Sequence, residues 1–242
     1  FDVVRARVQE DEGAEQPSEL DVRRFEHPVY GPMADWNVSR ITDMSNCFVN
    51  FQFNADLSAW DVSNVERMEI TFSGANHFNC DLSAWDVSRV TGMLHCFADA
   101  QAFNQDLSAW DVSAVTNMSS MFAGATAFNG DISGWDVSNV TTMANMFREA
   151  TAFNQDLPLW DVSKVIFSNS MFRDATAFNG NIADWKFSRL RWMQHMFDGA
   201  TAFNQDLSKW DLKVSHGGNA FRNTQMTQER KPKIWGRAWV WG

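Results

Sequence analysis

The chain has 242 residues, of which 45% are hydrophobic and 21% charged, and its 30 acidic and 20 basic side chains give a formal net charge of −10. This composition fits a folded domain and excludes a disordered chain. The acidic balance argues against non-specific nucleic-acid binding, and no apolar run approaches the roughly 20 residues of a transmembrane span. The aromatic residues are skewed, with 20 Phe and 12 Trp against one Tyr, which indicates a short pattern copied many times.

The N-terminal residues 1–32 lie outside any repeat and are predicted to form an arm or cap. Residues 1–30 carry 8 acidic and 4 basic side chains. The stretch 9–19 has no apolar periodicity and is predicted to be an extended arm or a solvated linker.

A block of 25 residues recurs through residues 33–212. Periods of 20 to 50 residues are typical of solenoids, in which each unit buries its apolar face only against its neighbours. Two Phe columns hold 14 of the 20 Phe, so repetition explains the aromatic composition. The Trp and Asn columns are predicted to be structural ladders, with each Asn satisfying backbone groups of its own and the next unit. They are Trp60, Trp85, Trp110, Trp135, Trp160, Trp185, Trp210, and Asn54, Asn79, Asn104, Asn129, Asn154, Asn179, Asn204.

The unit at 103–127 is predicted to combine a strand with a helix. Residues 106–112 alternate in polarity with the two-residue period of a short strand. Val115, Met118 and Phe122 follow at the i, i+3, i+7 spacing of one helical face, with Ser113 as N-cap and Gly124 as stop. The predicted fold class is therefore an α/β repeat of about seven units, each with a short parallel strand and a short helix, stacked at about 4.8 Å per strand.

The repeat resembles a known family. The motif Phe-Asn-x-Asp-Leu-Ser-x-Trp-Asp-Val-Ser-Asn-Val-Thr-x-Met-Ser-x-Met-Phe is similar to the 25/26-residue repeat of bacterial surface lipoproteins, a relative of BspA-like leucine-rich repeats that also occurs in algal proteins. The resemblance covers about three quarters of the chain. It implies a leucine-rich-repeat-like, right-handed solenoid, a surface or interaction role, a cell-surface location and no family-wide catalytic residue.

Two Asp columns invite a metal-binding interpretation. Stacked carboxylates repel one another, and calcium would offset the repulsion. The alternative is that each Asp accepts backbone N–H groups at a turn or helix start, and this alternative is favoured because Asn181 and Lys186 interrupt the columns. No metal or other cofactor is predicted.

The His and Cys residues and the short sequence motifs show no catalytic pattern, so no enzyme is predicted. Five His residues share no metal-binding spacing, and no nucleophile elbow, phosphate loop or Cys-x-x-Cys pair occurs, so no catalytic residue is assigned. Cys47, Cys80 and Cys96 are predicted to be free thiols, because the two that share a phase lie two units apart. Free thiols favour an organellar or intracellular assembly as much as the cell surface, so the sequence leaves the compartment open.

Departures from the repeat are the functional signal, because positions that only stack have no reason to deviate. Phe167 and Trp192 occupy a phase that is polar elsewhere, and with Ile166 they are predicted to form an apolar partner-binding strip on the flank. The alternative is that Phe167 turns inward to replace the Met that is missing at Ser168, which leaves only Trp192 unusual.

The C-terminal residues 213–242 are cationic and rich in Trp. Residues 222–242 carry 5 basic and 1 acidic side chains, and Trp235, Trp239 and Trp241 are further partner-binding candidates. The segment is predicted either to cap the last repeat or to dock into a partner or a peripheral membrane interface.

The predicted function is a non-catalytic protein–protein interaction or scaffold module, such as an accessory subunit of a larger assembly. Protein partners would bind at the flank or at the ends of the solenoid. No nucleic-acid partner and no transmembrane span are predicted. The alternative is a cell-surface adhesin or ligand-binding ectodomain, which the bacterial resemblance suggests.

Overall fold

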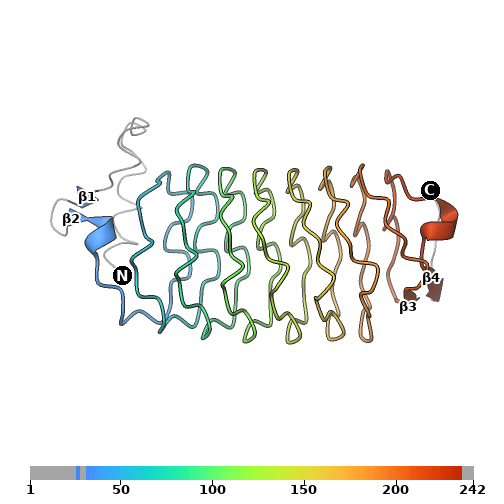
Figure 1. Cartoon of the computed structure of the whole chain (residues 1–242), viewed down its shortest axis with the longest axis horizontal. Coiled ribbons are helices and arrows are strands. Elements are labelled where there is room, and N and C mark those ends of the chain that lie inside the picture. The colour runs from blue at the N-terminus through green and yellow to red at the C-terminus, as the bar shows by residue number, and fades with distance from the viewer. Residues whose placement is uncertain (1–25, 28–30, 236–242) are drawn as a thin grey trace.

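The computed structural model describes residues 26–27 and 31–235. The chain winds in successive coils that stack along one long axis, so the first and last described residues lie at opposite ends (Figure 1). One parallel β-bridge joins each coil to the next, and the bridged residues form what we call the bridge ladder. Its members are Asp43, Arg67, Gly92, Asn117, Thr142, Phe167, Trp192 and His216.

Regular secondary structure is confined to the two ends of the stack (Figure 1). At the first end β1 (Glu26–His27) pairs antiparallel with β2 (Gly31–Pro32), which leads into the 3-10 helix η2 (Met33–Asp35). At the last end β3 (Asp211–Lys213) pairs parallel with β4 (Lys233–Trp235), and the 3-10 helix η3 (Gln228–Arg230) lies between them.

The predicted strand-plus-helix unit is wrong. The described residues contain no α-helix, and within the repeat they contain isolated bridges in place of strands. The bridge residue Asn117 lies inside the segment that was expected to be helical. Ser113 does not cap a helix, since its own N–H donates to the Asp111 carboxylate over 3.0 Å. The structure is therefore not an α/β repeat of the leucine-rich-repeat type.

The backbone of the expected helix alternates between two kinds of hydrogen bond. The N–H groups of Met118, Ser120 and Phe122 donate to carbonyls of the next coil over 2.8–3.1 Å. The intervening N–H groups of Met121 and Ala123 donate three residues back, closing tight turns. Ser120 has a φ of 54°, and Gly124 one of 70°. A left-handed residue every fourth position prevents a helix, because α-helical residues all have negative φ.

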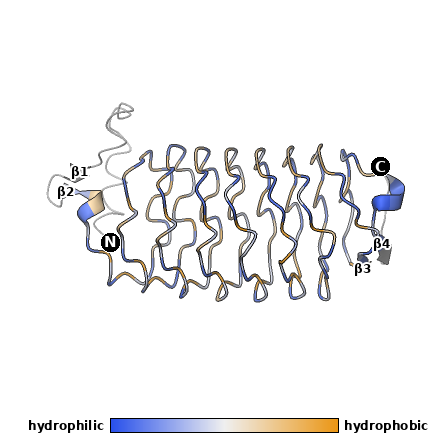
Figure 2. Cartoon of the chain, in the orientation of Figure 1, coloured by the Kyte–Doolittle hydropathy of each residue, from blue (hydrophilic) through white to orange (hydrophobic). Residues whose placement is uncertain are grey.

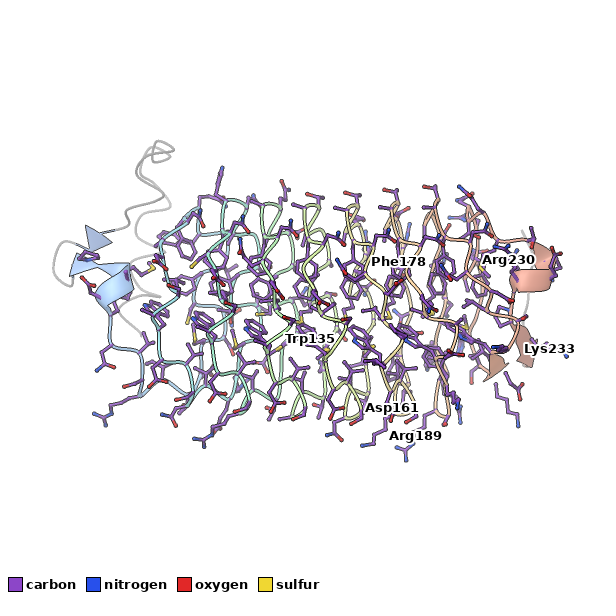
Figure 3. All side chains as sticks on the ribbon, in the orientation of Figure 1. Trp135, Asp161, Phe178, Arg189, Arg230 and Lys233 are labelled. Carbon is purple, nitrogen blue, oxygen red and sulfur yellow. The ribbon has the colours of Figure 1, made fainter. Side chains whose placement is uncertain are left out.

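The core is a set of aromatic ladders along the stack axis. The indole N–H of Trp135 donates to the carbonyl of Leu107 in the preceding coil over 2.9 Å, and the other repeat Trp also donate to a carbonyl of the preceding coil, which for Trp210 is that of Ala183. Trp135 and Phe178 lie inside the stack, while Asp161 and Arg189 lie at one long edge (Figure 3). Hydrophobic and hydrophilic segments alternate around every coil (Figure 2). Each coil thus buries its apolar face against its two neighbours.

The Asn column joins neighbouring coils by hydrogen bonds. The side-chain oxygen of Asn104 accepts the backbone N–H of Asn129 over 2.8 Å, and the same bond recurs from Asn54 to Asn204. The predicted bond to the next unit is present, but the side chains do not point inward, because Asn104, Asn129, Asn154 and Asn179 are exposed. At the last step Asn204 has no further repeat, and its buried Oδ1 accepts no hydrogen bond from the described residues.

The Asp columns accept hydrogen bonds at turns. The backbone N–H of the residue two positions later donates to the carboxylate in both columns, as from Ser108 to Asp106 over 2.8 Å. Asp156 is the exception, because Pro158 has no N–H. Its carboxylate instead accepts the backbone N–H of Asn181 in the next coil over 2.7 Å. Among residues 26–27 and 31–235, no group of three or more His, Cys, Asp or Glu is arranged to hold a metal ion.

Acidification is expected to destabilise the fold through these turns. Hydrogen bonds from the hydroxyl and the backbone N–H of Ser113 hold the pKa of Asp111 below its usual value of 3.8, and seven other Asp of the columns are shifted likewise by their own Ser. Because the folded pKa is the lower one, this stabilisation is present above about pH 4 and is lost as the pH falls through the folded values. The measurement is urea unfolding at pH 7, 5 and 3.

The matched control is Asp111→Asn, which keeps an acceptor oxygen for the turn but does not titrate. Asn181 shows that an Asn can take this place, because its side-chain oxygen accepts the backbone N–H of Ala183. This variant should lose less stability between pH 5 and pH 3 than the parent chain. A free energy of unfolding that stays constant over that range would contradict the assignment.

Candidate interaction surface

Phe167, Trp192 and His216 form a continuous stack of rings, which we call the aromatic strip. They are the last three members of the bridge ladder, whose earlier members are Asp, Arg, Gly, Asn and Thr. The ring centroids of Phe167 and Trp192 are 6.2 Å apart, and those of Trp192 and His216 are 3.7 Å apart with an interplanar angle of 5°. The bridges impose this geometry, because they place equivalent side chains of consecutive coils side by side.

The strip is open to solvent. Phe167 is 41% exposed, His216 is exposed, and Trp192 and Ile166 are half-buried. Ser168, not Phe167, occupies the core position that Met holds in other coils, and it is fully buried. Its hydroxyl donates to the carbonyl of Trp192 over 3.3 Å. The alternative in which Phe167 turns inward is therefore wrong.

Five exposed cations lie in the same coils as the strip, and we call them the cationic flank. They are Lys164, Lys186, Arg189, Arg191 and Lys213. Lys164 and Arg189 each lie three residues before a ring of the strip, within about 10 Å along the chain. The guanidinium of Arg191 donates to the backbone carbonyl of Leu190 over 3.0 Å and to that of Lys213 over 3.5 Å. At the repeat position of Lys164 and Arg189 the earlier coils carry Arg89, Ala114 and Asn139, and Arg89 is paired with Glu66.

Five other arginines of the stack are paired with a carboxylate, whereas Arg40 and Arg230 form no ion pair with the described residues. Arg67, Arg89, Arg148, Arg173 and Arg222 each lie within 3.5 Å of a carboxylate. None of the five cations of the flank takes part in an ion pair with the described residues. The nearest acidic groups in sequence are the exposed Asp161, Asp184 and Asp211, and Lys164 contributes to the lowered pKa of Asp161. The five cations of the flank therefore outnumber the three carboxylates nearest to them in sequence, and the described residues hold none of the five in an ion pair.

The other candidate residues lie apart from the strip. Trp235 is in β4 at the end of the stack, and Trp239 and Trp241 lie outside the described residues. Leu159, 77% exposed beside Pro158, is an exposed apolar residue that the sequence analysis did not select. His216 was also missed, because the last coil is one residue short and shifts it out of the 25-residue phase.

A buried charge cluster clamps the last coil to the stack. Asp198 is fully buried, and the guanidinium of Arg222 in the next coil donates to both of its carboxylate oxygens over 2.9 and 2.7 Å. His195 and Asn223 contact the same carboxylate at 3.0 and 3.3 Å. Burial alone would raise the pKa of Asp198, but Arg222 and His195 outweigh it and lower that pKa. The contacts of Arg222 and Asn223 with Asp198 join the last coil to the preceding one.

The three cysteine side chains lie in the interior of the stack. Cys47, Cys80 and Cys96 are free and buried, which confirms the prediction of free cysteines. Burial raises the pKa of Cys80 to about 11, so this thiol stays protonated at neutral pH. No helix of the described residues is long and apolar enough to cross a membrane.

Comparison with known proteins places the chain in a family. A family model described as "Mycoplasma protein of unknown function, DUF285" matches residues 22–134 and again residues 125–235. No curated protein and no solved structure gives a significant match. The match supports the resemblance to a bacterial repeat family, whereas the relation to BspA-like leucine-rich repeats stays a prediction. Because the two matched segments together span most of the sequence, the chain belongs to the DUF285 family.

Proposed function

We propose that the chain is a non-catalytic protein-interaction module in which the stack is a rigid support and the last three coils carry the docking surface. The observation that carries this proposal is the aromatic strip, where Phe167 is exposed and Trp192 half-buried on a ladder whose earlier members are not aromatic. Exposed, contiguous aromatic rings are typical of interaction sites, since they bury large apolar area at little cost in side-chain entropy. The same surface would suit a scaffold subunit of a larger assembly.

Replacing Trp192 with Ser is expected to abolish partner binding while leaving the melting temperature nearly unchanged. Trp192 covers no core ladder, and surface substitutions of this kind change the free energy of unfolding by about 0.5 kcal/mol or less. The measurement is affinity capture from source cells with the parent and variant chains side by side, together with thermal unfolding of each chain.

Asn117→Ser is the matched control, because Asn117 lies on the same bridge ladder in the polar part of the stack. A partner retained by the parent and the control but lost by Trp192→Ser supports the proposal. If the variant retains every partner of the parent chain, the strip is not the docking surface.

A further inference from the structure

Resting on the proposed function, we infer that the docking surface binds the acidic N-terminal segment 8–22 of a second copy of this chain. The surface consists of the aromatic strip, which is Phe167, Trp192 and His216, and the cationic flank. It combines unpaired positive charge with exposed rings, so its occupant must supply negative charge and an apolar contact.

The segment 8–22 has this composition. It contains six acidic residues, Glu10, Asp11, Glu12, Glu15, Glu19 and Asp21, and no Lys or Arg. Val8, Leu20 and Val22 provide apolar side chains at its two ends. Six carboxylates therefore face five cations, and the apolar residues can cover the rings. No other stretch of similar length in the chain has as many acidic residues without a basic one.

Chain length prevents the whole segment from docking on its own flank at once, although its first residues, about 15 residues before Glu26, are not limited in this way. β1 lies at the first end of the stack (Figure 1), and Leu20 is six residues before Glu26, a reach of about 20 Å. Phe167 lies five bridge steps beyond Asp43, which amounts to about 24 Å along the axis. The end of the segment nearest to β1 cannot reach its own flank. Docking between copies joins the first end of one stack to the last coils of another, which is a heterologous contact.

The test is sedimentation velocity of the purified full chain from 1 to 100 µM, in 50 and 300 mM NaCl. The expected result is concentration-dependent self-association that weakens about tenfold in the higher salt, because exposed charges are screened. Two variants should each abolish it. The first changes Arg189, Arg191 and Lys213 to Gln, and the second changes the six acidic residues of segment 8–22 to their amides.

Both variants alter exposed residues or the N-terminal segment, and thermal unfolding verifies that they fold. The control changes Arg148 and Arg173 to Gln, two cations that lie outside the flank. A synthetic peptide of residues 8–22 should compete with self-association, and the peptide with its acidic residues amidated should not.

Three outcomes would overturn the inference. One is a chain that stays monomeric at 100 µM, and another is self-association that survives both variants. The third is a monomeric chain whose flank binds a single-stranded oligonucleotide as tightly as the peptide, which would indicate a general polyanion site. None of these outcomes bears on capture of a different protein by the aromatic strip, so the proposed function is tested separately.

Discussion

Trp185→Ser is expected to lower the free energy of unfolding by about 3–5 kcal/mol, the cost of deleting a large buried aromatic side chain. Trp185 is 3% exposed, and its ring lies 6.0 Å from that of Trp160 and 6.2 Å from that of Trp210, almost parallel to both. Its indole N–H also donates to the carbonyl of Leu157 over 2.8 Å, and the substitution removes that donor. The measurement is chemical unfolding of the variant and the parent chain.

The effect of Trp185→Ser should be cooperative along the axis. Each coil is stabilised only by its neighbours, so a gap in the Trp ladder weakens the contacts to the coils before and after it. A loss below about 1 kcal/mol would mean that Trp185 does not pack between coils, since substitutions away from such features cost that little.

Gly130→Ala is the second large expected effect. A Cβ built on Gly130 would lie 2.0 Å from the backbone carbonyl oxygen of Gln105 in the preceding coil. The neighbour is backbone, so relief requires the two coils to move apart, and overpacking of this kind costs about 1–3 kcal/mol or more. Gly180 meets the carbonyl of Gln155 in the same way, so Gly180→Ala should behave alike. The measurement is the midpoint of thermal and urea unfolding.

Gly134→Ala is the control for Gly130→Ala. Gly134 lies four residues later in the same coil, and a Cβ there meets nothing within 4 Å. This substitution should be neutral or slightly stabilising, because alanine reduces the freedom of the unfolded chain. Equal midpoints for Gly130→Ala and Gly134→Ala would contradict the close approach of the coils at Gly130.

The repeat phase predicts which side chains form ladders but not the backbone that carries them. Met118, Met121, Phe122 and Ala125 are spaced like one face of a helix, and all four are buried. Overlapping tight turns with a left-handed residue every fourth position produce the same spacing, so the pattern alone cannot separate the two. The sequence did contain one signal for these turns, which is the residue type at the left-handed positions. Asn46 and Asn50 are examples, and Asn, Asp and Gly tolerate positive φ better than other residues.

The aromatic strip was predictable where its residue types differ from those at the same position of the other repeats. Phe167 and Trp192 share a phase, and the bridges place them side by side. His216 could not be assigned from the period, because one residue is missing between Trp192 and His216. The cationic flank could not be recognised either, since a cation is distinctive only when the structure shows which other cations have carboxylate partners.

Ladder aromatics are expected to stabilise the stack, whereas aromatics that break the pattern are expected to bind a partner. Trp185 and Trp192 test this distinction most directly, because they lie seven residues apart in one coil and accept the same substitution to Ser. Thermal unfolding of the two variants beside the parent chain is the measurement. Trp185→Ser is expected to lower the melting temperature by about 10 °C, and Trp192→Ser by about 2 °C or less. An equal loss in both variants would contradict the account.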